Sequence, residues 1–467
     1  MIHVSKPMTD LPEEYKTPLQ EMTYKFLDKN NIPFSRVEND EAVTMEDCIE
    51  IDKALDMKTV KTLFLSNRQK TNFYLFVTAG DKPFVTKDFS SALGISRVSF
   101  ASAEKLDEIF DNLVKVRTEI AHKLGFRNFT ELAYLRRTRN CYDPEMVANF
   151  RRQVVKDIVP IVVELKKKQA ERIGMKPEEM RIYDDNFNFA EGNPKPLGTP
   201  DDIMAAGKKM YEEMSPETAE FINFMYSNEL LDLVAKDGKA VGGYCTEFPE
   251  YKAPFIFSNF NGTSGDVDVL THEAGHAFAY YTARNFEFSE NISPTMESCE
   301  CHSMSMEFLA WKWLNLFYGD DTDRAKYVHL GSALIFLPYG CMVDHFQHIV
   351  YDNPDLTPAE RHAEWKKLEA IYRPYLNPDD VDFYALGRGW QRQLHIYHYP
   401  FYYIDYCLAQ TVSLEFWSMS QKDWNDAWKH YYKFVEQGGK QTFTELCRTA
   451  GIKVPFEDGA LKDIADG

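Results

Sequence analysis

Helical spacing of apolar residues dominates this chain from residue 102 onward and sets its class of fold. The first run has apolar side chains every three or four positions, at Leu106, Ile109, Phe110, Leu113, Val116, Ile120 and Leu124. Gly125 then supplies a helix stop signal. The same period recurs at 144–174, 200–236, 266–284, 294–318, 323–350, 358–373, 400–419 and 421–437. A chain of 467 residues with this pattern can bury a large core, so we predict a mainly α fold.

One section of the helical part departs from this period. Residues 242–266, "GGYCTEFPEYKAPFIFSNFNGTSGD", combine glycine, proline and aromatic residues. That composition is typical of a hairpin or of paired strands. We expect the section to lie at the lip of a site and to offer an edge strand to a peptide backbone, with Gly243 among the substrate-binding positions.

The first hundred residues have a different pattern, which indicates a mixed α/β region. The stretches "VKTLFLSN" (60–67) and "TNFYLFVTAGD" (71–81) are rich in β-branched and aromatic residues and are bounded by polar residues or glycine. The join to the helical part falls inside an expected helix near residue 112, without a flexible linker. We therefore predict a small α/β domain at 1–112 and a mostly helical domain at 113–467.

Charge and cysteine content narrow the classes of function. The formal net charge of −19 argues against a broad nucleic-acid surface, although it leaves room for a small basic patch. The start of the chain lacks the apolar segment of a secretory signal, and no stretch approaches the length of a membrane span. Eight scattered cysteines have no disulfide-scaffold spacing. We expect a cytoplasmic protein with reduced thiols and no membrane partner.

The stretch "THEAGHAF" at 271–278 has the spacing of a metal site. His272 and His276 are four apart and share one helix face, and Glu273 beside them is close enough to reach a metal-bound water. We expect Asp266 to cap this helix. The simpler alternative is an ordinary helix that carries two histidines.

Zinc needs a third protein ligand, which the next helix offers. That helix has acidic residues at Glu297, Glu300 and Glu307, of which one can ligate and another can support the ligands. The alternative is an exposed acidic helix. Cys299 and Cys301 diverge from Glu300 by about 100° per residue, so we interpret both as packing residues.

A late aromatic segment, "QRQLHIYHYPFYYIDYCLAQ" at 391–410, contains His395, His398 and several tyrosines. Hydrolysis of a peptide bond needs donors for the oxyanion of the tetrahedral intermediate, and Tyr and His side chains can serve. For most of these tyrosines an aromatic core helix is the favoured interpretation.

These motifs together resemble the oligoendopeptidase F / thimet oligopeptidase family of zinc metallopeptidases. The likeness covers about residues 113–460 and lies in "THEAGHAF", "ESCECHSMSMEFLAW", "FYYIDYCLAQ" and the section before the first motif. It implies a neurolysin-like, all-helical fold with a deep channel that admits only short peptides. Relatives in that family have a long helical stretch before the matched region, and this chain lacks it.

The resemblance also implies roles for particular residues. One zinc ion per chain would be held by His272, His276 and Glu300, with Glu273 as the general base. His395 and Tyr406 are the best matches for the residues that contact substrate and stabilise the transition state. A second substrate-binding tyrosine corresponds to Tyr397 or Tyr399 in this sequence.

The first 110 residues resemble a different family, the prolyl-tRNA-editing type of domain, which hydrolyses misacylated tRNA. The likeness lies in "VTMEDCIEIDKAL", "VKTLFLSNRQKTNFYLFVTAGDKP" and "LGISRVSFASAEKLDEI". It implies an editing-site role for Lys61 and places "GDKP" (80–83) in the same pocket. The later glycine- and proline-containing half of that domain is absent, and the alternative for Lys61 is a solvated lysine at a strand start.

The leading prediction is a zinc-dependent endopeptidase that hydrolyses peptide bonds in short oligopeptides, with a metal-activated water and a glutamate base. One alternative is an aminoacyl-tRNA deacylase, with tRNA as the partner of the N-terminal domain. The other is a catalytically impaired remnant that binds peptides and metal. The oligomeric state, the cleavage preference and the choice of zinc over another divalent metal are left open by the sequence.

Overall fold

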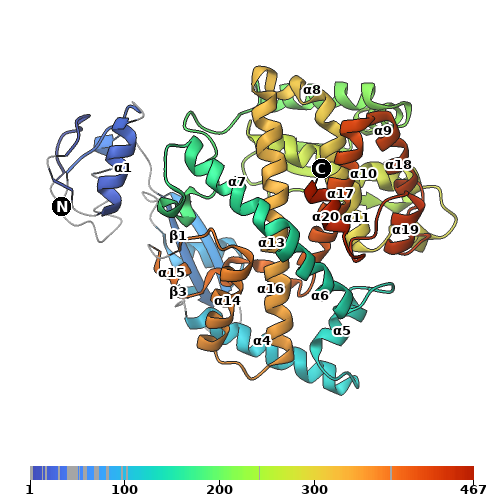
Figure 1. Cartoon of the computed structure of the whole chain (residues 1–467), viewed down its shortest axis with the longest axis horizontal. Coiled ribbons are helices and arrows are strands. Elements are labelled where there is room, and N and C mark those ends of the chain that lie inside the picture. The colour runs from blue at the N-terminus through green and yellow to red at the C-terminus, as the bar shows by residue number, and fades with distance from the viewer. Residues whose placement is uncertain are drawn as a thin grey trace. The chain divides into compact units, whose positions relative to one another are not determined.

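The protein is described here by a computed structural model (Figure 1). The described residues are 4–12, 14–15, 18–29, 32–38, 51, 53–55, 60–67, 73–79, 84–95, 98–100, 104–240, 242–378 and 381–466. The chain divides into two compact units, at 1–112 and at 113–467. The division falls inside one continuous helix, α4 (Glu104–Lys123).

The first unit contains a small antiparallel sheet. Its elements are α1 (Pro18–Lys29), β1 (Val60–Asn67), β2 (Phe73–Ala79), α3 (Thr86–Ala92) and β3 (Val98–Phe100). The strand order is β2-β1-β3, and Lys61 on β1 pairs with Thr78 on β2. The two strands expected at 60–67 and 71–81 are confirmed, because β-branched and aromatic side chains pack well on a pleated surface. The "GDKP" segment at 80–83 lies outside the described residues.

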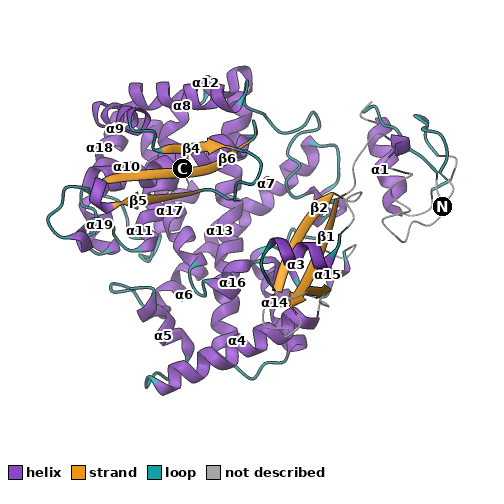
Figure 2. Ribbon diagram, turned by 180° about the vertical axis from the view of Figure 1, so that it is seen from behind, coloured by secondary structure: helices purple, strands orange, loops and turns teal. Residues whose placement is uncertain are grey.

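The second unit is mostly helical, which confirms the predicted mainly α class (Figure 2). Its helices are α5 (Phe129–Arg136), α6 (Pro144–Gln153), the π-helical turn η1 (Val154–Ile158), α7 (Val159–Arg172), α8 (Pro200–Met214), α9 (Pro216–Ser227), α10 (Ser264–Ala283), α11 (Met296–Leu309), α12 (Asn315–Tyr318), α13 (Thr322–Asp352), α14 (Pro358–Tyr372), α15 (Asp382–Ala385), α16 (Leu394–His398), α17 (Tyr403–Lys422), α18 (Trp424–Val435), α19 (Phe443–Thr449) and α20 (Ala460–Asp466). Among the helices that the structure describes, none is both long enough and apolar enough to cross a membrane.

A three-stranded sheet interrupts the helices, with order β4-β6-β5. The strands β5 (Tyr244–Phe248) and β6 (Ala253–Phe260) form an antiparallel hairpin, as predicted for 242–266. The predicted helix over 200–236 is wrong in its last quarter, where β4 (Leu231–Val234) pairs parallel with β6. The helix ends because Asn228 closes α9 and Glu229 adopts a positive φ of 53°, which turns the chain into the sheet.

The core of the second unit is the stack of α10, α11 and α17, which lie side by side (Figures 1 and 2). Gly275 on α10 faces the backbone of α11 directly. A Cβ atom at this glycine would lie 2.6 Å from Ser303 Cα and 2.8 Å from the carbonyl oxygen of His302. The missing side chain therefore lets the two helices meet backbone to backbone. Because the two helices approach so closely, side chains of α10 and α11 can meet at one site.

Candidate metal centre

The helix α10 begins with a capping box, in which a carboxylate of the first turn accepts backbone N–H groups of the preceding residues. It starts at Ser264 with Thr263 as the N-cap, so the prediction that Asp266 is the cap is wrong by three positions. Asp266 instead lies in the first turn and reaches back, where its Oδ2 accepts the backbone N–H groups of Asn261, Gly262 and Thr263 at 2.8, 2.6 and 3.2 Å. A carboxylate at N3 that bonds backward is the second half of a capping box. The loop from β6 into α10 is held firmly in this way.

Two histidines of α10 and one glutamate of α11 converge. Nε2 of His272 lies 3.4 Å from Oε2 of Glu300, and Nε2 of His276 lies 3.5 Å from the same oxygen. One ligand atom from each of the three residues lies within 4.8 Å of the others. Ligands about 2.0–2.1 Å from a tetrahedral zinc ion are separated by roughly 3.4 Å, so this donor set fits zinc.

Outer contacts fix the orientation of the ligands. Nδ1 of His272 lies 2.7 Å from Oε1 of Glu307, whose other oxygen lies 2.9 Å from Nε2 of His329. Trp311 then donates its indole N–H to Nδ1 of His329 at 3.0 Å. A carboxylate behind a ligating histidine sets its tautomer and ring orientation and raises its basicity. With Glu307 on Nδ1, the Nε2 atom of His272 is the one directed at Glu300.

Glu300 is held on its other side by a tyrosine. The hydroxyl of Tyr402 donates to Oε1 of Glu300 at 2.5 Å, and Ser303 Oγ lies 3.3 Å from Oε2. Burial opposes ionisation of Glu300, but its hydrogen bonds to the two histidines outweigh burial and hold its pKa well below the usual range. Likewise, burial lowers the pKa of His272, while hydrogen bonds to Glu300 and Glu307 raise it more, so the net shift is upward.

Glu273 lies beside this cluster on α10 and is 9% exposed. Its burial is the largest cause of a raised pKa, which the nearby His272 and His276 partly offset. The backbone N–H of Cys245 on β5 donates to its carboxylate. A carboxyl with a raised pKa next to a metal site is suited to accept and return a proton near neutral pH.

Comparison with known proteins identifies the second unit. A family model described as Peptidase family M3 matches residues 95–466. The chain belongs to this family. A second model, the aminoacyl-tRNA editing domain, matches residues 39–115.

Two solved structures share this fold, and one further relative is similar in sequence. PZ peptidase A, solved with an inhibitor, is 55% identical with a TM-score of 0.75, and the match covers 78% of this chain and 64% of that one. A candidate oligoendopeptidase F from Bacillus anthracis str. Ames is 49% identical with a TM-score of 0.69, covering 81% and 64%. An oligoendopeptidase F homolog from Mycoplasma genitalium (strain ATCC 33530 / DSM 19775 / NCTC 10195 / G37) is 21% identical over 262 residues, covering 52% and 42%. This M3 chain therefore spans less than two thirds of the length of these relatives.

The late aromatic segment of the M3 unit lies against the cluster. The ring of His395 lies 6.1 Å from those of Tyr402 and Tyr406, measured between centroids. Gln393 Nε2 lies 2.6 Å from Nδ1 of His395. Burial, followed by the positive charge of Arg137, lowers the pKa of His395, and burial raises the pKa of Tyr406.

The other predicted substrate-binding residues differ in how exposed they are. Tyr397 is 8% exposed and stacks on Trp390, with 5.9 Å between ring centroids, whereas Tyr399 is 58% exposed. Gly243 is exposed just before β5, where a Cβ atom would lie 3.2 Å from Ser258 Oγ. Lys61 lies in the first unit on β1. Of the two tyrosines, Tyr399 is the one accessible to a ligand.

The remaining acidic and thiol groups of α11 lie outside the cluster. Glu297 is 1% exposed, and Thr295 Oγ1 lies 2.5 Å from its Oε1. Cys301 is fully buried, and Cys299 is half-buried with its thiol directed at the carbonyl oxygen of Pro294. In the described residues neither cysteine joins the three-residue ligand group, in line with their interpretation as packing residues.

Sequence reasoning missed the contact between Tyr402 and Glu300 and the support of His272 through His329. Tyr402 is one of several tyrosines in the same segment, so composition could not single it out. His329 lies on α13, 22 residues after Glu307, with no motif around it. The two side chains meet through the tertiary fold, in which the ring of His329 also lies 4.6 Å from that of Phe308 on α11.

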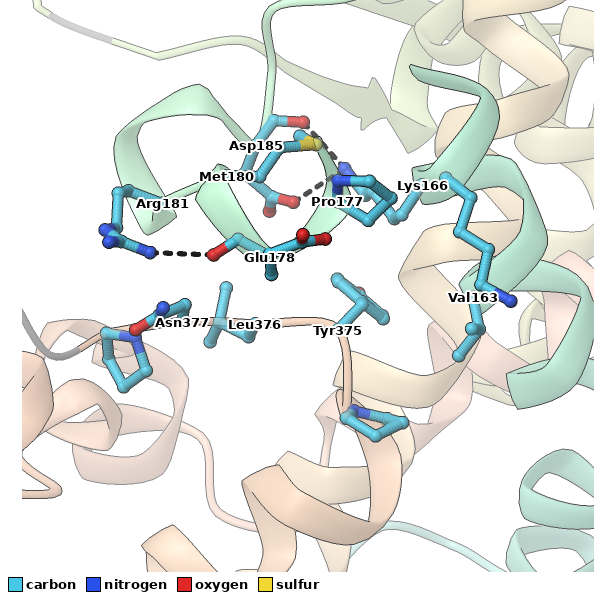
Figure 3. A pocket seen from close by; sticks show the side chains of 13 residues that line it. Val163, Lys166, Pro177, Glu178, Met180, Arg181, Asp185, Tyr375, Leu376 and Asn377 are labelled. Carbon is cyan, nitrogen blue, oxygen red and sulfur yellow. Dashed lines mark hydrogen bonds and ion pairs between the residues drawn. The ribbon is translucent and has the colours of Figure 1, made fainter. Parts of the chain in front are cut away.

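A separate pocket lies away from the metal centre (Figure 3). It is a cavity of about 510 Å³ lined by residues 163–185 and by the loop at 374–378. The buried ammonium group of Lys166 in this pocket already has protein partners. Its Nζ lies 2.6 Å from Asp185 Oδ1 and 3.0 Å from Gln169 Oε1. It includes none of the residues of the metal centre.

Proposed function

We propose that this chain is a zinc-dependent endopeptidase that hydrolyses peptide bonds in short oligopeptides. The observation that carries the proposal is the convergence of His272, His276 and Glu300 beside the buried Glu273. Membership of peptidase family M3 supports the reaction class. Zinc, bound at one ion per chain, would supply Lewis-acid activation of water and of the scissile carbonyl group. We also propose that the protein acts in the cytoplasm.

Side chains of the protein supply the proton transfer and the hydrogen bonds to the oxyanion. Glu273 takes a proton from the attacking water and returns it to the leaving amine, for which its raised pKa is suited. With Gln393 Nε2 donating to Nδ1 of His395, a neutral His395 has its N–H at Nε2 and can donate to the developing oxyanion. Tyr406, whose burial keeps it protonated, is a second donor.

The strand β5 supplies a binding edge for the substrate. It pairs with β6 on one side and forms the edge of the sheet among the described strands. Since the N–H of Cys245 donates to Glu273, the outer side of β5 faces the base. A peptide that adds to this edge is held through its main chain, which gives broad sequence tolerance. Tyr399 and Gly243 are proposed to contact its side chains.

The test replaces Glu273 by Gln in the full chain and follows cleavage of an internally quenched oligopeptide. We expect a loss of at least about 100-fold in kcat/KM, the usual range for a general base, with zinc still bound at one per chain. E287Q, at an exposed position, is the matched control and keeps full activity. Undiminished cleavage by E273Q excludes the proposed base. One zinc per chain without hydrolysis in the unchanged protein supports the peptide-binding remnant instead.

A second proposal concerns the first unit, because residues 39–115 match the aminoacyl-tRNA editing domain. We propose that this unit hydrolyses the ester of misacylated tRNA with the help of Lys61. The assay follows deacylation of mischarged tRNA by zinc-stripped protein, and K61A is expected to abolish it. Deacylation that K61A leaves unchanged, or that requires zinc, contradicts this role.

A further inference from the structure

Three arginines near the start of the M3 unit donate to main-chain carbonyl groups of one short segment, residues 396–401, here called the 396–401 turn. The first, Arg117 on α4, connects α13 to the 396–401 turn. Its Nη1 donates to the hydroxyl of Tyr351 at 2.7 Å and to the carbonyl oxygen of Ile396 at 3.4 Å. Its Nη2 donates to the carbonyl oxygen of Tyr397. One guanidinium group therefore holds two successive peptide units.

The other two arginines follow α5 and bind the rest of the turn. Arg137 donates from Nε to the carbonyl oxygen of Pro400 at 3.2 Å. Arg139 donates from Nη2 to the carbonyl oxygen of Phe401 and, at 2.7 Å, to Oδ1 of Asp405. The Arg139 and Asp405 side chains are 0% and 1% exposed, so this pair is out of contact with solvent. Hydrogen bonds from charged donors are stronger than those between neutral groups.

The turn needs such partners for two physical reasons. The helix α16 has only five residues, so the carbonyl groups at its C-terminus lack intrahelical donors. Phe401 has a φ of 63°, which is uncommon for a non-glycine residue and persists only where neighbouring groups enforce it. Gln347 on α13 adds a further constraint, because its Oε1 accepts the N–H of Phe401 at 2.8 Å.

The residue directly after this turn is Tyr402, whose hydroxyl donates to Oε1 of Glu300. Arg137 contacts the ring of Tyr402 as well, with its Cζ 5.2 Å from the ring centroid. The direction of the Tyr402 side chain is set by the backbone at 401–402. A change in the φ of Phe401 would therefore move the hydroxyl away from Glu300.

We propose that Arg117, Arg137 and Arg139 are positioning residues, which hold the 396–401 turn so that Tyr402 stays on Glu300. Through Tyr402 they orient Glu300 as a metal ligand. Their effect on turnover rests on the proposed function, whereas their effect on metal binding can be measured without any peptide assay.

The experiment is a double-mutant cycle on zinc affinity in the full chain, with R137Q, Y402F and the combined variant. Arg137 is half-buried, so its loss leaves no buried charge unpaired, in contrast to Arg139. We expect R137Q and Y402F each to weaken zinc binding about 10-fold, at the lower end of the range for outer-shell partners. The combined variant should be no weaker than Y402F alone, because both changes remove the same contact. The dissociation constants are measured by chelator competition.

Matched variants separate positioning from general destabilisation. R136Q changes the neighbouring, exposed arginine at the end of α5 and should leave zinc affinity unchanged. R117Q tests the turn from the other side and should reproduce the effect of R137Q, while R137K, which retains a cationic donor, should restore part of the affinity. Thermal unfolding of each variant shows that it is folded.

Unchanged zinc affinity in both R137Q and R117Q, or an effect of R137Q that adds fully to that of Y402F, overturns the proposal. In a peptide assay R137Q should lower kcat with little change in KM. Failure of the unchanged protein to cleave any peptide contradicts the proposed function only, since the zinc cycle still decides the role of the arginines.

Discussion

The α10–α11 pair and the 396–401 turn, which Tyr402 directly follows, both contribute to the same centre, but they are specified in different ways. On α10 the ligands His272 and His276 are four residues apart, so one helix turn aligns them. The turn instead depends on partners far away in sequence: Arg137 and Pro400 are 263 residues apart. The ligand spacing is therefore local information, whereas the orientation of Tyr402 depends on long-range contacts.

The largest effect should come from removing a metal ligand on α10. His276→Ala removes one of the three groups that hold the metal. We expect zinc affinity to fall by more than about 100-fold, which exceeds the range for partners that only support a ligand. The loss should therefore be much larger than the loss caused by R137Q. Zinc content after dialysis and chelator competition measure it. Retention of one tightly bound zinc per chain would falsify the assignment of this residue.

Replacing Glu307 by Gln tests the support behind His272. The change keeps the shape but removes the charge that lies 2.7 Å from Nδ1 of His272. We expect zinc affinity to drop about 10- to 100-fold. The same competition assay applies, with the exposed E287Q as the control. A Glu307 variant that binds zinc like the unchanged protein shows that His272 is oriented by other contacts.

Gly275→Ala tests whether the α10–α11 contact holds the centre together. The new Cβ would lie 2.6 Å from Ser303 Cα, so the two helices must separate. Overpacking of this kind costs about 1–3 kcal/mol of unfolding free energy, measured by urea titration of the metal-free protein. G331A is the matched control, since a Cβ at Gly331 on α13 meets no atom within 4 Å. The control should be neutral or stabilising by up to about 1 kcal/mol.

The smallest effect concerns the pH dependence of the unfolding free energy, through the buried Glu297 on α11. Burial, followed by the charge of Asp405, raises the pKa of Glu297 to about 7, compared with about 4.3 in an unfolded chain. The folded protein therefore binds more protons between these pH values, and its unfolding free energy falls as pH rises from about 4 to 7. E297Q should make this slope shallower. An identical slope in E297Q shows that Glu297 does not titrate in that window.

Metal binding at the α10–α11 side should have the opposite pH trend. His272 must lose its proton before it can ligate, and its pKa in the metal-free protein is raised by Glu300 and Glu307. Zinc affinity is therefore expected to increase with pH in the neutral range.

Much of the architecture followed from periodic patterns. The continuous helix across 104–123, the 242–266 hairpin and the first-unit strands were all predicted, because helical and strand periods are properties of short windows. The strand at Leu231–Val234 was predicted as a helix, since a short apolar run has no period of its own and its pairing with β6 decides its conformation.

The site was predictable to a similar depth. The spacing predicted His272, Glu273 and His276, and the family resemblance implied Glu300 among the three acidic candidates of the next helix. The structure brings the three proposed ligands together. Tyr402, which contacts Glu300, was not predicted, whereas the predicted Tyr406 is hydrogen-bonded to Tyr402, with 4.9 Å between their ring centroids. Aromatic composition indicates that tyrosines are near a site but does not say which hydroxyl reaches a given oxygen.

By itself the sequence determined that two histidines share a helix face and that an acidic helix follows, because both depend only on the helical repeat. The tertiary structure decided that Glu300 rather than Glu297 completes the trio and that Glu307 lies behind His272. It also decided that three distant arginines hold the turn before Tyr402. These choices depend on how closely helices approach and on where unpaired carbonyl groups find donors, which no local spacing records.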